Sequence, residues 1–163
     1  MSAAAKPAPG DVVGDADAWL QKLYGAETGT FRRQPIGLLA RELGRMWQTG
    51  RAFRRQGLDG VLPLPPVKER SLPSTGLAEA RRLAWYARIK SRLLFGVQPC
   101  LFECVTVAVT LRGRGLPVEI VVGHLNSPLR GGLDEVHAWL EQRGEFVSAD
   151  MLPSFYAEVA RYA

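Results

Sequence analysis

The 163-residue sequence contains only two cysteines and two histidines, and it has no long apolar run. Two cysteines, without the charged-then-apolar layout of a secretion signal, predict reduced thiols in a cytoplasmic protein rather than a disulfide scaffold. No stretch approaches the ~18 uninterrupted apolar residues of a membrane-spanning helix, so stable membrane insertion is not expected. With 47% hydrophobic and 23% charged residues, the composition is typical of one globular domain.

Positive charge is concentrated in one part of the sequence. Residues 32–92 hold fourteen Lys and Arg against four Asp and Glu, a net charge of +10, whereas residues 1–31 and 93–163 carry −2 and −3. Such a region can bind an acidic peptide, an anionic membrane surface or nucleic acid, or can simply be a solvated surface. It contains no nucleic-acid-binding motif, so we expect no nucleic-acid partner.

Composition divides the sequence into three segments. Residues 1–30 are rich in Ala, Pro and Gly, which predicts a disordered extension with one short helix at 15–25. Residues 31–75 have apolar residues at helical spacing up to residue 56, which predicts a helix followed by a linker rich in Pro and Gly. Residues 76–163 contain both cysteines and both histidines and are expected to form the main domain.

The third segment predicts helices followed by a small antiparallel sheet. Helical spacing, β-branched runs and a tight turn at "RGE" define its elements. The expected elements are helices over 77–95 and 100–112, strands over 118–125, 136–142 and 146–150, and a closing helix over 152–163. The all-round apolar character of 100–112 predicts a central helix. This order predicts an α+β fold.

Cys100 opens the predicted central helix, directly after Pro99. Pro is well tolerated in a first helical turn, because its missing N–H would have no partner there. A thiol in this turn lies beside unpaired N–H groups and the positive end of the helix dipole, and both favour the thiolate. Cys100 is therefore the candidate nucleophile.

A reactive thiolate needs an imidazole partner, and the imidazole needs an orienting group. Period-two alternation predicts one shared face for His137, Trp139 and Glu141, and one for Phe146, Ser148 and Asp150 on the next strand. If the register pairs these faces, Asp150 can hold one imidazole nitrogen while the other addresses Cys100. Spacing alone leaves open that His137 is a core residue.

Cys104 and His124 have simpler interpretations. Cys104 is expected to pack as a small hydrophobe, and one rigid helix disfavours a disulfide with Cys100. Together with Cys100 and His137 they form a ligand set that would suit zinc. A helical cysteine pair and histidines on different strands argue against that metal site. We expect His124 to be structural.

Three stretches resemble the transglutaminase-like cysteine peptidases that remove leader peptides in lasso-peptide biosynthesis: "LAEARRLAWYARIKSRLLF", "PCLFECVTVAVTLRGRGLPVEIVVGH" and "VHAWLEQRGEFVSAD". That family has a Cys-Leu pair opening a helix, a Leu-Arg-x-x-Gly turn, a Val-Ile-Gly strand, and His-Ala-Trp-Val-Glu ahead of an aspartate. The corresponding positions here are Cys100-Leu101, Leu111-Arg112 with Gly115, Val121-Val122-Gly123, His137-Ala138-Trp139-Leu140-Glu141 and Asp150. The resemblance spans residues 77–150 and extends more weakly back to residue 35. Cys104 departs from it, because the family usually has a small residue or Ser there.

The resemblance implies a papain/transglutaminase-like fold with residues 76–163 as the catalytic domain. It implies hydrolysis of the peptide bond between leader and core, with Cys100 as nucleophile, His137 as proton carrier and Asp150 as orienting group. No metal or organic cofactor follows from this mechanism. Gln98 is a weaker candidate for an oxyanion donor beside the N–H of Cys100. The alternative is a non-catalytic peptide-binding domain of the same fold.

The resemblance also implies partners. These are the precursor leader peptide, a separate small leader-recognition protein and a cyclising enzyme acting alongside. We expect the arginine-rich helices of residues 32–92 to provide part of the surface that binds the leader or the recognition protein. Arg54, Arg55 and Trp139 are the candidate residues of this surface.

Overall fold

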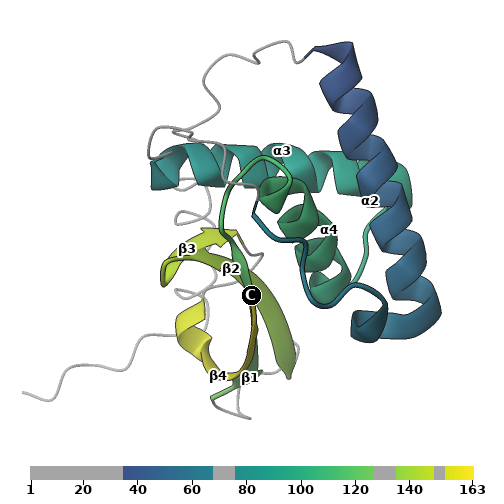
Figure 1. Ribbon diagram of the computed structural model, residues 1–163. Coiled ribbons are helices and arrows are strands. Elements are labelled where there is room, and N and C mark those ends of the chain that lie inside the picture. Colours follow the sequence, from purple (N-terminus) through teal and green to yellow (C-terminus); the bar gives the residue numbers. More distant parts are fainter. Residues whose placement is uncertain (1–34, 68–75, 127–134, 149–152) are drawn as a thin grey trace, which may run out of the picture.

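The computed structural model describes residues 35–67, 76–126, 135–148 and 153–163. Among these residues three α-helices precede four strands, and Figure 1 shows how the elements are arranged. The elements are α2 (Ile36–Gln56), η1 (Gly57–Gly60), α3 (Leu77–Phe95), α4 (Cys100–Arg112), β1 (Glu119–Leu125), β2 (Val136–Gln142), β3 (Glu145–Ser148), η2 (Pro153–Phe155) and β4 (Tyr156–Tyr162). The predicted α+β class is confirmed, and so are the three long helices. The helix predicted at 15–25 lies outside the described residues.

Helix α4 forms the centre of the molecule. Every residue from Phe102 to Leu111 is buried, because α2 and α3 pack on α4 from one side and strands β1 and β2 from the other (Figure 1). A helix covered on all sides needs apolar residues on all sides, so the prediction of a central helix is confirmed. No single described helix is long and apolar enough to span a membrane; α3 and α4 pass that test only as a pair, bent by 120°.

The four strands form one antiparallel sheet in the order β3-β2-β1-β4. Ile120 lies opposite Leu140 in the register of β1 and β2, and both belong to the core around α4. The neighbouring pair, Val121 and Trp139, belongs to a separate cluster with Tyr156. One face of the sheet therefore covers α4, while the other carries this second, aromatic cluster.

The end of the chain differs from the prediction. Residues 152–163 were expected to form a helix, but 153–155 form the short η2 turn and Tyr156–Tyr162 form strand β4. Ala, Glu and Arg in this segment favour a helix locally. Strand β1, however, has an outer edge whose backbone groups need partners, and β4 pairs with it from Ile120 to Leu125. Tertiary pairing outweighs local propensity here.

Strand β3 contains a bulge that alters the predicted hairpin. Ser148 pairs with Leu140, whereas Phe146 pairs with Glu141, and the register shifts between these two pairs. Phe146 consequently packs on the aromatic cluster, while Ser148 lies with Leu140 on the α4 side. The prediction that Phe146 and Ser148 share a face is wrong, because the extra residue of a bulge breaks the alternation. Asp150 lies outside the described residues.

The predicted linker after α2 is partly anchored to the core. Leu64 is buried, and Arg112 donates hydrogen bonds to the carbonyl oxygens of Pro65 (2.7 Å) and Val118 (3.0 Å). Arg112 thereby joins the end of α4, the linker and the approach to β1. The domain boundary predicted at residues 75 and 76 stays a prediction, since residues 68–75 are not described.

A buried carboxylate ties the three helical segments together. Glu42 of α2 is buried and accepts hydrogen bonds from Lys90 of α3 at 2.6 Å and from Arg114, just after α4, at 2.5 Å. Burial alone would raise the pKa of Glu42, but the bonds and charges of Arg114 and Lys90 outweigh it and hold that pKa below its ordinary value. Glu42 is therefore ionised at neutral pH and paired on both oxygens.

Gly123 of β1 marks a close approach that a side chain would block. A Cβ at this position would lie 2.7 Å from the Trp139 ring and 2.9 Å from the backbone oxygen of Ala157. We expect Gly123→Ala to lower the free energy of unfolding by about 2 kcal/mol, measured by urea denaturation, because a rigid strand cannot make room. Gly44→Ala is the control. A Cβ added at Gly44, on the exposed side of α2, would have no atom within 4 Å. This change should raise the free energy of unfolding by up to ~1 kcal/mol. A neutral Gly123→Ala would contradict this packing.

Candidate active site

Cys100 is the first residue of α4, preceded by Pro99 in an extended conformation (φ −53°, ψ 147°). Its thiol is reduced and half-buried. The first N–H groups of a helix have no partner within the helix, and the chain approaches this end without a capping side chain. The helix start that the sequence predicts for Cys100 is therefore present, and the thiol is partly accessible. Both conditions favour a thiolate.

Cys100 lines a small pocket between α4, α3 and the sheet. The pocket has room for about one water molecule and is partly open to solvent. Its apolar wall is formed by Cys104, Val107, Ala138 and Leu140, and its polar residues are Arg88, Glu103 and Ser148. The pocket thus lies between the thiol of Cys100 and the β2 residues Ala138 and Leu140.

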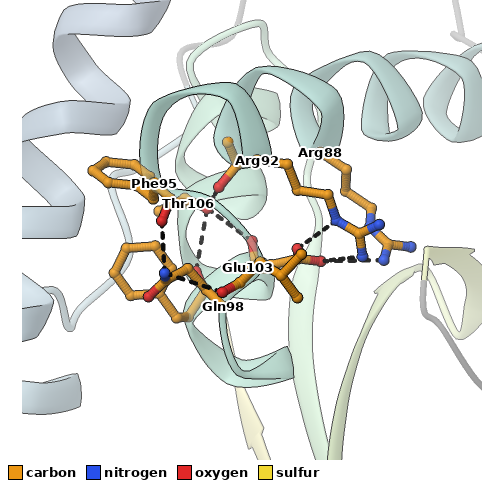
Figure 2. Close-up of polar contacts among 9 residues, drawn as sticks. Arg88, Arg92, Phe95, Gln98, Glu103 and Thr106 are labelled. Atoms are coloured by element: carbon orange, nitrogen blue, oxygen red, sulfur yellow. Dashed lines mark hydrogen bonds and ion pairs between the residues drawn. The ribbon is translucent and has the colours of Figure 1, made fainter.

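A charged cluster of Arg88, Arg92 and Glu103 lies beside the pocket, and Figure 2 shows its hydrogen bonds. Glu103, one helical turn after Cys100, is buried and accepts hydrogen bonds from Arg92 Nε (2.6 Å), Arg92 Nη2 (3.2 Å) and Arg88 Nη2 (3.1 Å). Two arginines thus bind one carboxylate through charge-assisted hydrogen bonds. Ser91 and Thr106 are hydrogen-bonded at 2.9 Å between the same two helices, which fixes α3 against α4.

His137 lies near the start of β2 and is 3% exposed. It pairs with Gly123 in the sheet, and its ring lies 5.3 Å from the ring of Tyr156. Tyr156 also contacts Trp139 at 6.3 Å between ring centroids. The predicted shared face of His137, Trp139 and Glu141 is confirmed by this cluster and by the hydrogen bond from Trp139 Nε1 to Glu141 Oε1 at 2.7 Å.

The thiol and the imidazole belong to neighbouring parts of the molecule. Ala138, the residue after His137, lines the pocket with Cys100. Strand alternation points the ring of His137 to the other face of the sheet, towards Tyr156. The pairing of Cys100 with His137 stays a prediction, and the role of Asp150 lies outside the described residues.

Gln98 has a structural role that the sequence does not predict. Its side-chain amide donates to the carbonyl oxygens of Phe95 (2.7 Å) and Val97 (3.2 Å), at the end of α3 (Figure 2). These bonds satisfy acceptors left open by the last turn of the helix. The amide is thus engaged away from an oxyanion, and the N–H of Cys100 is the better donor candidate.

The remaining candidates separate into buried and exposed residues. Trp139 is 3% exposed, so its assignment to a binding surface is wrong: it packs over Gly123 in the sheet. Arg54 and Arg55 are exposed, as a binding surface requires. His124 is exposed at the end of β1, whereas Cys104 is buried. Among the described residues no group of three or more His, Cys, Asp or Glu is arranged to hold a metal ion.

Cys104 packs in the core as predicted. It is 7% exposed, and its Sγ donates to the carbonyl oxygen of Ala138 at 3.3 Å, tying α4 to β2. Since alkylation requires an accessible thiolate, we expect iodoacetamide at neutral pH to modify Cys100 at least ~10-fold faster than Cys104. Peptide mass spectrometry after timed labelling distinguishes the two thiols. Equal rates, or faster labelling of Cys104, would show that Cys100 is not activated.

Sequence reasoning missed three residues at the site: Arg88, Ser148 and Tyr156. Arg88 belongs to the positively charged segment, and its spacing four residues before Arg92 gave a signal for a shared helix face. Ser148 reaches the pocket only because of the bulge in β3. Tyr156 reaches His137 only because the last segment is a strand. Neither the bulge nor the strand pairing leaves a clear local signal.

A half-buried thiol that opens a buried helix packed on an antiparallel sheet is the arrangement of papain- and transglutaminase-like folds. The family model described as "Transglutaminase-like superfamily" matches residues 45–161, well over half of the chain. The protein therefore belongs to the transglutaminase-like superfamily, which confirms the coarser part of the resemblance. No curated protein and no solved structure gives a significant match to the chain.

Proposed function

We propose that the protein is a cysteine endopeptidase that removes the leader peptide from a ribosomally made, lasso-type precursor. The observation that carries the proposal is the position of Cys100: it opens the buried helix α4 and lines a pocket. Membership of the transglutaminase-like superfamily supports thiol chemistry at this position. The lasso-type substrate rests on the resemblance of the Cys-Leu and His-Ala-Trp segments.

The proposed reaction uses two steps of acyl transfer. The ring of His137, which contacts Tyr156 in the structure, would have to turn to Cys100 and take its proton. The thiolate then attacks the carbonyl carbon of the scissile peptide bond. The tetrahedral intermediate collapses to a thioester, and the leaving amine of the core peptide takes the proton from the imidazolium. A water molecule, deprotonated by His137, then hydrolyses the thioester and releases the leader with a free carboxylate. Asp150 would orient the imidazole throughout.

The start of α4 would also stabilise the oxyanion. The N–H of Cys100 and its neighbours point out of the helix end and can donate to a developing negative charge. These groups favour the tetrahedral intermediate over the neutral carbonyl, which is the requirement for catalysis.

The proposal includes partners in the cytoplasm. A separate small leader-recognition protein would capture the precursor, and a cyclising enzyme would act on the released core. The test is incubation of the protein and this recognition protein with precursor peptides encoded next to its gene, followed by mass spectrometry for a free leader. Leader release supports the proposal, and an intact precursor under these conditions refutes it.

A non-catalytic peptide-binding domain is the second candidate. It is favoured by the orientation of His137 towards Tyr156, on the sheet face that does not cover α4. In that case the pocket beside Cys100 would hold a peptide without cleaving it. Binding of the intact precursor without leader release would identify this function.

A further inference from the structure

We propose that one exposed side of α2 binds an acidic, apolar segment of the leader peptide. This side, the Trp47 face, is formed by Trp47, Arg51 and Arg54 of α2 together with Phe95 of α3. The nature of the peptide rests on the proposed function, whereas the face itself is defined by contacts among described residues.

The three α2 residues lie on one side of the helix, because positions 47, 51 and 54 follow the i, i+4, i+7 spacing. Trp47 is 47% exposed, and its indole stacks flat on Phe95, with ring centroids 5.8 Å apart and an interplanar angle of 6°. One side of the indole is thus held by protein. A large aromatic ring that is rigid and half-exposed is a typical anchor for a binding partner.

Arg54 is held in place without a carboxylate. Its Cζ lies 5.3 Å from the Phe95 centroid and 5.4 Å from the Phe102 centroid, and its Nη2 donates to Gln98 Oε1 at 3.4 Å. These contacts orient the guanidinium and leave its charge unneutralised. In the part of the chain that the structure describes, neither Arg51 nor Arg54 forms an ion pair. Both guanidinium groups are therefore available to bind carboxylates.

The residues beneath the Trp47 face pack closely against one another. A Cβ at Gly50 would lie 2.6 Å from Phe95 Cζ and 3.1 Å from Phe102 Cζ. The absence of a side chain at this buried position lets Phe95 pack directly against α2. Phe95 in turn contacts Phe102 of α4 edge-on at 5.1 Å. The face is consequently a fixed structure rather than a group of flexible surface side chains.

The Trp47 face lies near the start of α4, which carries the thiol. Gln98, which accepts from Arg54, lies two residues before Cys100, and Phe102 lies two residues after it. A peptide held on the face by Arg54 would therefore reach the start of α4 within a short length of chain. This position suits the part of a leader that lies close to the scissile bond.

Charge complementarity indicates an acidic occupant. Residues 32–92 carry a net charge of +10, and the arginines of the face add to the exposed Arg55. Nucleic acid would satisfy the same charge, and a base could stack on Trp47. The position of the face near the start of α4, where the proposed substrate is a peptide carbonyl, favours the peptide. Carboxylates would bind the guanidinium groups, and an apolar side chain would cover the indole.

The test measures fluorescence anisotropy of labelled peptides with the full-length Cys100→Ala variant at low salt. The probes are repeats of Glu-Glu-Leu, Gln-Gln-Leu and Lys-Lys-Leu, and a single-stranded oligonucleotide. We expect the Glu-Glu-Leu peptide to bind most tightly, with an affinity that falls as salt is added. Arg51→Glu and Trp47→Ala should each weaken it about tenfold, which corresponds to ~1.4 kcal/mol.

Arg41→Glu is the matched control. It makes the same charge change at an exposed position of α2, on a different side of the helix, and should change the affinity less than about twofold. Equal losses in Arg41→Glu and Arg51→Glu, or tighter binding of the oligonucleotide than of the acidic peptide, would overturn the inference. Circular dichroism confirms that each variant is folded.

The outcomes separate this inference from the proposed function. If the wild-type protein releases no leader but the Glu-Glu-Leu peptide binds with the expected dependence on Arg51 and Trp47, the face is supported and the peptidase is not. If leader release proceeds with an unchanged KM in Arg51→Glu and Trp47→Ala, the peptidase is supported and the face is refuted.

Discussion

Replacement of Cys100 by Ala should abolish leader release. The proposed mechanism has no other nucleophile at the start of α4, and removal of a catalytic nucleophile lowers kcat by on the order of 10⁵-fold or more. The thiol is half-buried and forms no disulfide, so the loss of one sulfur atom should leave the fold intact. Mass spectrometry of the precursor after long incubation, together with an unchanged melting curve, checks both points.

Two matched variants make this result specific. Cys104→Ser replaces the other thiol by a hydroxyl that can still donate to the Ala138 carbonyl oxygen, and it should retain most activity. His124→Ala removes the exposed histidine at the end of β1 and should do the same, whereas His137→Ala should be inactive. An inactive His124→Ala with an active His137→Ala would reverse the assignment of the imidazole. Full activity of Cys100→Ala would end the thiol mechanism.

Replacement of Glu42 by Gln should strongly lower the free energy of unfolding. The carboxylate is buried between Lys90 and Arg114, whose side chains are 14% and 18% exposed. Removing one charge of a buried network leaves the others without compensation, and we expect a loss of roughly 3 kcal/mol at pH 7. Urea denaturation followed by circular dichroism measures the difference from wild type.

The effect of Glu42→Gln should depend on pH in one direction. Arg114 and Lys90 overcome the opposing effect of burial and lower the pKa of Glu42 in the folded protein below the ordinary 4.5. A lowered carboxylate pKa stabilises the fold fully above the unfolded value and loses this stabilisation as the pH falls through the folded pKa. The difference between wild type and variant should thus persist from pH 7 to about pH 5 and shrink below pH 4.5.

Glu79→Gln is the control for this substitution. Glu79 is half-exposed and lies 3.5 Å from Arg82 in the first turn of α3, so its loss should cost less than about 1 kcal/mol. Equal effects of the two substitutions, or a Glu42→Gln effect that grows on acidification, would contradict the buried network.

The helices were the most predictable part of the fold. Leu77–Phe95 and Cys100–Arg112 have the bounds that apolar spacing, Pro99 and the following glycines indicate. Strands β1 and β2 were equally clear from their β-branched residues, and the hairpin of β2 and β3 from the turn at Arg143 and Gly144, which are all local features. In each case the information that decides the structure lies within a few residues of the element.

Features that depend on distant partners were not predictable from the sequence. Strand β4 forms because β1 offers an unpaired edge, a condition created far from residues 156–162. Gln98 caps α3 only because the turn between α3 and α4 brings its amide back to Phe95. The position of Cys100 at the start of α4 was predictable, since Pro99 fixes it locally. The side of the sheet that His137 faces depends on the register of three strands.

The extra residue in β3 has a consequence for any attempt to alter substrate preference. Val147 fills the core while its neighbour Ser148 borders the pocket, so two consecutive side chains serve the same side of the strand. Deleting Val147 would restore regular pairing with Ser148 still opposite Leu140 and Phe146 still opposite Glu141. A deletion at this position would therefore keep the hydroxyl at the pocket wall and remove one buried core side chain.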